Sequence, residues 1–303
     1  MLFTKMPGAG NDFVVIDARP DDQNWENLAR SICDRHFGVG ADGIILICSS
    51  DVADLRMRMF NPDGSEAEMC GNGIRCFAKY AVDREIVSPD ITKFDVETLA
   101  GVLPIFPSLE NGEMKSARVG MGTPRLRCSD IPVDVTQRLK VIGSQISVAQ
   151  VSTESSIEYF IPSEDLVVDW PLFIEGIELK VTGVSMGNPH AVAFVDVPVE
   201  EFPLERIGPL VEHHPMFPQR VNFEIVNILN RHQLRVRVWE RGAGLTMACG
   251  SGASAVAVAA QIHGYVDREI EISLPGGILS IQWDGKGEVF LEGPAVEVFQ
   301  GNW

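Results

Sequence analysis

An internal repeat constrains this 303-residue chain more than any other feature of its sequence. Residues 55–81, LRMRMFNPDGSEAEMCGNGIRCFAKYA, align without gaps with residues 234–260, LRVRVWERGAGLTMACGSGASAVAVAA. In this register Cys70 falls on Cys249, and each cysteine begins a Cys-Gly-x-Gly sequence. The length of the chain is sufficient for two domains of ordinary size, so the repeat predicts two related halves.

Each copy of the repeat predicts a strand, a turn and a helix in the same order. The strand alternates apolar residues with arginines, and the alanine-rich stretch after the glycines is typical of a helix. The second of these stretches, ASAVAVAAQIHG, is apolar on nearly all sides and predicts a fully buried helix. The repeat extends weakly in both directions. Upstream, GNDFVVID resembles GNPHAVAFVD. Downstream, FDVETLAGVL resembles IEISLPGGIL, and both of these predict a strand, a turn and a second strand.

These patterns predict an α/β (α+β) fold with two halves of related structure. We expect the N-terminal half to span residues 1–122, completed by the last strand in 293–303, and the C-terminal half to span 123–292. The boundary lies near VGMGTP, after the turn-rich PSLENGE sequence. The stretch from residue 125 to residue 180 is irregular and has no functional interpretation.

Composition excludes several classes of function. A net charge of −17 argues against a protein that binds the nucleic-acid backbone, which requires clustered Lys and Arg. No apolar run is long enough to span a membrane, and the first residues, MLFTKMPGAGND, lack the layout of a signal peptide. We therefore expect a cytoplasmic protein with no nucleic-acid or membrane partner.

The six cysteines do not form a pattern typical of metal binding or of a disulfide framework. None stands in a CxxC pair, so we expect no metal site and no structural disulfide. Cys33, Cys48 and Cys76 are interpreted as packing residues. Cys70 and Cys249 differ, because a thiol at the start of a helix faces unpaired backbone N–H groups and the positive end of the helix dipole. We expect this position to lower the pKa of both thiols.

Two such thiols suggest a specific reaction. If the halves face each other across a pseudo-twofold axis, both helix starts point into one cleft. A thiolate can then remove the α-hydrogen of an amino acid while a thiol donates a proton to the opposite face. No cofactor motif is visible to stabilise the carbanion, so the backbone N–H groups of the helix starts would hold its carboxylate.

With these motifs in order, the sequence resembles the diaminopimelate epimerase family of cofactor-independent amino-acid epimerases. The resemblance is carried by KMPGAGNDFVVID, FGVGADGIILI, MRMFNPDGSEAEMCGNGIRCFAKY, ETLAGV, VSMGNPHAV, RVNFEIV, VRVWERGAGLTMACGSGASA and GPAVEVF. It implies interconversion of LL- and meso-2,6-diaminopimelate in lysine and peptidoglycan precursor biosynthesis. It further implies two pseudo-symmetric domains, each a β-barrel-like sheet around a central helix, an active site in the cleft between them, and a homodimer.

The resemblance also assigns roles to individual residues. Cys70 and Cys249 match the two catalytic cysteines, and His190 and Glu240 match residues that modulate their pKa values. The substrate-binding positions are Asn11, Asn61, Gly71, Asn72, Asn188, Asn222, Glu240, Arg241, Gly250 and Ser251. The chain departs from the family at Pro7, Ala9 and Gly43, the last of which replaces a glutamine that contacts substrate in many members.

Two alternatives remain open on sequence alone. A racemase of another amino acid, such as proline or histidine, would use the same pair of thiols, although Asn72 argues against the proline group. A redox sensor or amino-acid-binding module would instead use the facing cysteines as a reversible disulfide. That hypothesis leaves Glu240, Arg241 and the asparagines without a role.

Overall fold

The fold was determined as a computed structural model that describes residues 1–20, 23–88, 90–134 and 165–303. It is a mixed α/β structure in which strands predominate, with four helices in the described ranges. The helices are α1 (Trp25–Ile32), α2 (Gly71–Asp83), α4 (Leu204–Glu212) and α5 (Gly250–Ile262). None of the helices in these ranges is long and apolar enough to cross a membrane.

The strands of the first part of the chain pair in a mixed order. They are β1 (Leu2–Gly8), β2 (Asn11–Asp17), β3 (Gly43–Cys48), β4 (Leu55–Phe60), β5 (Glu66–Ala67), β6 (Phe94–Thr98), β7 (Gly101–Glu110) and β8 (Glu113–Gly120). β2 pairs in parallel with β3, and β4 with β6, whereas the pairs β1–β2, β3–β4, β6–β7 and β7–β8 are antiparallel.

The strands of the second part repeat this order of pairing. They are β9 (Trp170–Ile174), β10 (Ile177–Ser185), β11 (Pro189–Phe194), β12 (Asn222–Asn230), β13 (Gln233–Glu240), β14 (Gly244–Thr246), β15 (Glu269–Leu274), β16 (Gly277–Gln282), β17 (Phe290–Pro294) and β18 (Phe299–Asn302). β11 pairs in parallel with β12, and β13 with β15, at the positions where β2–β3 and β4–β6 are parallel. The repeat predicted from the sequence is thus present in the pairing of the strands.

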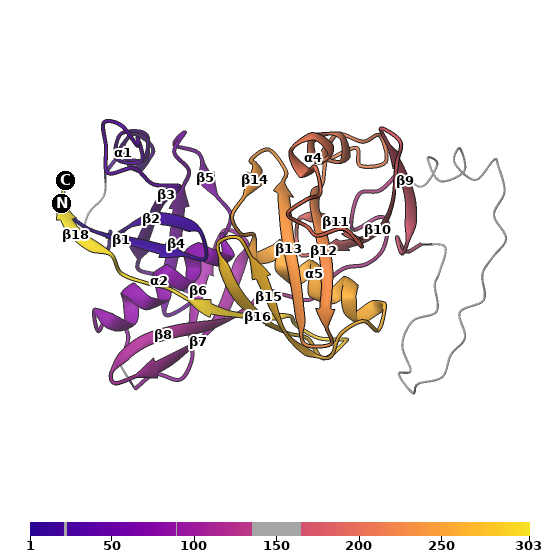
Figure 1. The fold of residues 1–303 in the computed structure, drawn as a ribbon. Coiled ribbons are helices and arrows are strands. Elements are labelled where there is room, and N and C mark those ends of the chain that lie inside the picture. The colour runs from indigo at the N-terminus through magenta and orange to yellow at the C-terminus, as the bar shows by residue number, and fades with distance from the viewer. Residues whose placement is uncertain (21–22, 89, 135–164) are drawn as a thin grey trace.

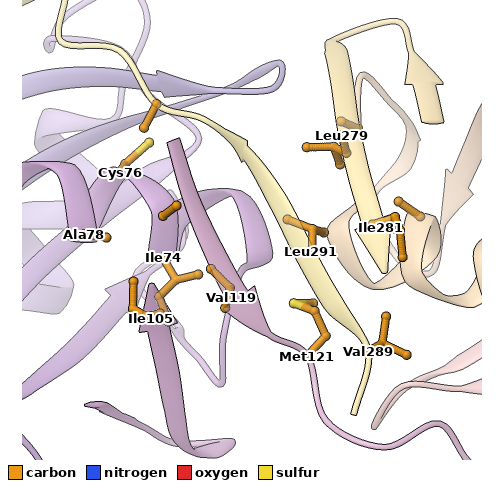
Figure 2. Close-up of a cluster of buried hydrophobic side chains, with 14 of the residues drawn as sticks. Ile74, Cys76, Ala78, Ile105, Val119, Met121, Leu279, Ile281, Val289 and Leu291 are labelled. Carbon is orange, nitrogen blue, oxygen red and sulfur yellow. The ribbon is translucent and has the colours of Figure 1, made fainter. Parts of the chain in front are cut away.

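Two pairings connect the parts of the molecule. β8 pairs antiparallel with β17, so that Val119 lies opposite Leu291, and both side chains enter one continuous core (Figure 2). The last strand, β18, returns to pair with β1, which places both chain ends side by side at one end of the molecule (Figure 1). The first and second parts of the chain therefore share a core, and the last strand of the chain pairs with the first.

The two repeat helices hold equivalent places in this arrangement. α2 contacts β1, β2, β3, β7 and β8, and α5 contacts β10, β11, β12, β16 and β17. Both predicted helices are confirmed, and α5 is buried at every position from Gly252 to Ala260, as its apolar sequence predicts. Because each helix is enclosed by strands, its direction and the position of its first turn are fixed by packing on all sides. Cys76, on α2, points into the core, as expected (Figure 2).

Candidate active site

Cys70 and Cys249 occupy the same position at the starts of α2 and α5. Each is the N-cap residue in an extended conformation, and its sulfur accepts a hydrogen bond from a glycine N–H in the first turn. The Gly73 nitrogen lies 3.5 Å from Cys70 Sγ, and the Gly252 nitrogen lies 3.4 Å from Cys249 Sγ. Both thiols are free, and both face the unpaired N–H groups of a helix start, as the sequence predicts.

The two helix starts meet each other directly. A Cβ atom added to Gly71 would lie 3.3 Å from the Cα of Gly250, and one added to Gly250 would lie 3.2 Å from the Cα of Gly71. A side chain at either position would require the facing backbone to move by a few tenths of an ångström. This mutual contact brings residues that are 179 positions apart to the two sides of one site.

A cleft of about 1150 Å³ opens above this contact. Both cysteines line it, and so do most of the other residues that the sequence singled out: Asn11, Asn61, Gly71, Asn72, Asn188, Glu240, Arg241, Gly250 and Ser251. Segments from both parts of the chain thus contribute to one cleft with polar side chains around two thiols. No group of His, Cys, Asp and Glu positioned to hold a metal ion occurs among the residues that the structure describes.

Asn222 and His190 lie beneath the cleft instead of lining it. The Asn222 amide accepts a hydrogen bond from the backbone N–H of Arg241 at 2.8 Å and donates one to the carbonyl of Pro189 at 2.9 Å. Its side chain therefore fixes the backbone at Arg241. His190 is fully buried on β11, with Nε2 3.0 Å from Oδ1 of Asn188.

The asparagines on the cleft wall are held by their neighbours. Asn72 donates to Oδ1 of Asn11 at 2.8 Å, and Asn11 donates in turn to Asp42 at 3.1 Å. Asn72 also donates to the carbonyl of Ala248 at 3.3 Å, the residue before the second cysteine. In the other half Asn188 donates to Ser251 Oγ at 3.3 Å. These bonds tie each helix start to the strand beside it.

Burial decides the pKa values of the two thiols. The N–H groups of the helix starts act to lower the pKa of each thiol, but desolvation outweighs them, so the pKa of Cys70 is raised and that of Cys249 is raised well above its ordinary value. The predicted net lowering is therefore wrong, because it neglected the depth of the site. Desolvation also raises the pKa of Glu240, against hydrogen bonds from Thr246 and Cys249.

Two buried charged residues beneath the helix starts were missed by sequence reasoning. Arg75, fully buried in α2, donates to the carbonyl of Gly71 at 2.7 Å and to Oδ1 of Asn72 at 2.9 Å. Glu224, fully buried on β12, lies 2.7 Å from Nδ1 of His190. A charged residue within an apolar helix or strand was the signal available, because such residues are rarely buried without a partner.

The replacement at Gly43 has a steric reason in this structure. Gly43 pairs with Phe13 on the neighbouring strand, and a Cβ atom added to it would lie 2.7 Å from the backbone oxygen of Phe60. A larger side chain at this position would require the backbone to shift. The glutamine that the resemblance leads us to expect at this position would therefore not fit here without a change in the backbone.

Comparison with known proteins gives a consistent result. The family model described as diaminopimelate epimerase matches residues 3–127 and 182–298. A diaminopimelate epimerase from Acetivibrio thermocellus is 45% identical over 99% of this chain and 98% of its own length. One from Moorella thermoacetica is 45% identical over 100% of this chain and 99% of its own length.

Solved structures share the fold at much lower identity. A probable proline racemase from Agrobacterium radiobacter matches with a TM-score of 0.67 at 13% identity, over 100% of this chain and 92% of its own. A PhzF-family phenazine biosynthesis protein from Bacillus anthracis matches with a TM-score of 0.64 at 16% identity, over 99% of this chain and 98% of its own. These likenesses establish a proline racemase-like and PhzF-like fold.

Proposed function

Because the chain belongs to the diaminopimelate epimerase family, we propose that it interconverts LL- and meso-2,6-diaminopimelate by two-base proton transfer. The observation that carries the mechanism is the pair of thiols at two helix starts that touch at Gly71 and Gly250. One thiolate removes the α-proton, and the opposite thiol donates a proton to the other face of the same carbon. Each turnover removes one proton from the α-carbon and adds another to its opposite face, so the protonation states of the two cysteines are exchanged.

The reacting end of the substrate is held at the helix starts. Backbone N–H groups of Gly71 and Asn72 on one side, and of Gly250 and Ser251 on the other, are placed to bind the α-carboxylate, whose negative charge grows as the proton leaves. This preorganised positive potential takes the place of a cofactor. Asn11 and Asn188 line the cleft next to these positions.

The distal amino-acid end of diaminopimelate requires groups of opposite charge. Arg241 on the cleft wall offers a guanidinium for the distal carboxylate, and Glu240 offers a carboxylate for the distal ammonium. Asn61 adds an amide on the facing wall, and Asn222 holds the backbone at Arg241. His190 and Glu240 are proposed to adjust the pKa values of the cysteines.

We further propose two pseudo-symmetric domains, each a β-barrel-like sheet around a central helix, with the active site between them. Residues 1–122 with the segment 293–303 form one, and residues 123–292 form the other. The repeated order of strand pairing and the enclosed positions of α2 and α5 support this division. A cut near residue 123 should leave the fragments 1–122 and 123–303 folded and bound to each other, because β18 pairs with β1 and β17 with β8, whereas unfolding after this cut would argue against the division.

A homodimer is proposed from the family resemblance. β18 is paired on one side with β1, and Leu2, Phe299 and Trp303 in these two ends are exposed apolar residues. An exposed apolar patch beside an edge strand is suited to cover by a second copy. Light scattering should give twice the mass of one chain, and Phe299→Glu should halve it.

The function is tested by incubating the purified protein with LL-diaminopimelate in D₂O. We expect meso product to form and the α-proton to exchange with solvent deuterium in the absence of added cofactor. Cys70→Ala and Cys249→Ala should each abolish epimerisation, whereas Cys48→Ala, at a partly buried thiol outside the cleft, should leave it intact. Full activity in either active-site variant would refute the mechanism, and turnover of proline or histidine instead would refute the substrate.

A further inference from the structure

Glu224 has no part in the proposed chemistry, yet it lies directly beneath the start of α5. A Cβ atom added to Gly252 would lie 2.8 Å from its Oε1. The same oxygen lies 2.7 Å from Nδ1 of His190, while Oε2 has no hydrogen-bond partner among the described residues. A buried carboxylate with one unsatisfied oxygen is costly to maintain, which suggests that its charge has a use.

A continuous chain of hydrogen bonds connects Glu224 with Cys249. From His190, Nε2 lies 3.0 Å from Oδ1 of Asn188, whose amide nitrogen lies 3.3 Å from Ser251 Oγ. Ser251 Oγ lies 3.4 Å from the sulfur of Cys249. Four links therefore join a fully buried carboxylate to the thiol in the cleft.

The donors and acceptors of this chain have two consistent arrangements. In the first, Cys249 is a thiolate that accepts from the Ser251 hydroxyl, and Ser251 accepts from the Asn188 amide. Oδ1 of Asn188 then needs an N–H at Nε2 of His190. Because Nδ1 faces Glu224, an additional proton must lie between His190 and Glu224.

In the second arrangement Glu224 is ionised and His190 is neutral. The ring donates its Nδ1–H to Glu224, so Nε2 becomes an acceptor and requires the amide nitrogen of Asn188, rotated by a half-turn. Oδ1 of Asn188 then accepts from Ser251. The Ser251 oxygen is left to accept a hydrogen from Cys249, which must be a thiol.

We propose that Glu224 is a positioning residue that accepts the Nδ1–H of a neutral His190, so that the chain through Asn188 and Ser251 takes the second arrangement and holds Cys249 in the thiol form before turnover. This proposal rests on the proposed function, in which one of the two cysteines must begin as the proton donor. It assigns that role in the resting enzyme to Cys249 and leaves Cys70 as the base, and the roles are exchanged when the reaction runs in reverse.

The other titratable groups near Cys249 do not reproduce this effect. Glu240, at the end of β13, acts on Cys249 and also on Cys70, so it does not distinguish the two thiols. Beneath Cys70, the residues in the positions of His190 and Glu224 are Phe13 and Ile45, which form no such chain. The chain of hydrogen bonds is therefore specific to one side of the cleft.

The test measures the rate of alkylation of Cys249 by iodoacetamide as a function of pH, in a Cys70→Ser background, with the modified peptide identified by mass spectrometry. Glu224→Gln keeps the shape of the side chain and removes its charge. We expect the midpoint of the Cys249 profile to fall by about one pH unit, which corresponds to roughly tenfold faster alkylation at neutral pH. Urea unfolding of the same variant reports whether the fold is retained.

A double-mutant cycle separates the chain from a direct effect of charge. Ser251→Ala cuts the chain next to Cys249 and leaves the backbone N–H groups in place, so adding Glu224→Gln should then shift the profile clearly less than it does with Ser251 present, because only the direct effect of the charge remains. An equal shift in both backgrounds would show that Glu224 acts through space, and would overturn the proposal. An unchanged profile in Glu224→Gln would also overturn it.

Cys70 provides the matched control. In a Cys249→Ser background, Glu224→Gln should leave the alkylation profile of Cys70 unchanged, and an equal shift there would overturn the proposal. Because alkylation does not depend on turnover, a shift at Cys249 together with a lack of epimerase activity in the unsubstituted protein would refute the proposed function alone. Epimerase activity without the shift would refute this inference alone.

Discussion

The two helix starts have the same backbone and different surroundings. Beneath Cys70, a Cβ added to Gly73 would meet Ile45 at 3.0 Å and Phe13 at 3.6 Å, whereas beneath Cys249 the equivalent atom on Gly252 would meet Glu224. The strand register confirms that Ile45 and Glu224 occupy equivalent positions. Ile45 lies two residues after Gly43, where the β2–β3 pairing begins, and Glu224 lies two residues after Asn222, where the β11–β12 pairing begins. Repetition has thus preserved the geometry needed for two bases while the electrostatics have diverged.

The buried charges have opposite signs on the two sides. In the first turn of α2, Arg75 donates a hydrogen bond to the carbonyl of Gly71. The equivalent residue in α5 is Ser254, which donates to the carbonyl of Gly250 at 3.0 Å. A cation therefore lies under Cys70 and a carboxylate under Cys249. Burial favours the thiol form on both sides, but the thiolate is less disfavoured at Cys70 than at Cys249, which is the asymmetry that the proposed two-base reaction needs at its start.

The largest effect is expected from removing the buried cation. Arg75→Met should lower the free energy of unfolding by about 3 kcal/mol, because it leaves buried acceptors at Gly71, Asn72 and Pro294 without their donor. Ser254→Ala, the matched change in α5, should cost about 1 kcal/mol. Urea unfolding measures both values, and equal losses would show that the two helix starts are held alike.

The contact between the helix starts should be sensitive from both sides. Gly71→Ala and Gly250→Ala should each lower kcat/KM about tenfold, since the facing backbone must move by a few tenths of an ångström and both thiols move with it. Gly287→Ala, whose added Cβ meets only ordinary contacts, is the control. Markedly unequal effects at Gly71 and Gly250 would mean that the backbone of one helix start can move to accept a methyl group and that of the other cannot.

The thiols should titrate in a fixed order. Desolvation raises the pKa of both, but Arg75 opposes the rise at Cys70 while Glu224 adds to it at Cys249. Alkylation should therefore begin at lower pH for Cys70, by about one unit. Burial raises the pKa of Cys76 to about 12, so that thiol should stay unmodified as an internal control. The reverse order would contradict the electrostatic difference between the sites.

The same shifts predict a loss of stability at high pH. A thiol whose pKa is raised in the folded state keeps its proton when the unfolded chain has released it. The contribution to stability is therefore complete below about pH 8.5 and is lost as the pH rises further. Cys249→Ala should reduce this loss more than Cys70→Ala in urea unfolding at pH 8 and pH 10, and equal reductions would argue that the two sites are electrostatically alike.

The smallest effect is expected at Glu240. Desolvation is the main reason that the pKa of each thiol is raised, and the charge of Glu240 raises both pKa values further. The effect of this charge is more important at Cys249 than at Cys70. Glu240→Gln should therefore lower both alkylation midpoints, by about half a unit at Cys249 and less at Cys70. A shift confined to Cys249 would show that Glu240 belongs to that side alone.

Local features of the site could be predicted because they depend on short stretches of sequence. The Cys-Gly-x-Gly sequence and the apolar run after it specify a helix with a thiol at its start, and alternation specifies the strand before it. The residues beneath the helix starts could not be predicted. His190 and Glu224 are 34 positions apart, and only the parallel pairing of β11 with β12 brings them together.

The sequence by itself determined that this chain carries two equivalent thiols at helix starts, because caps, turns and periodicity act over a few residues. Only the tertiary structure decided what surrounds each thiol. It closed the contact between Gly71 and Gly250, turned Asn222 toward the backbone, and buried the thiols so deeply that desolvation outweighs the helix N–H groups. Solvent exclusion and charge act through space, between segments that are distant in the chain, and so they depend on the completed fold.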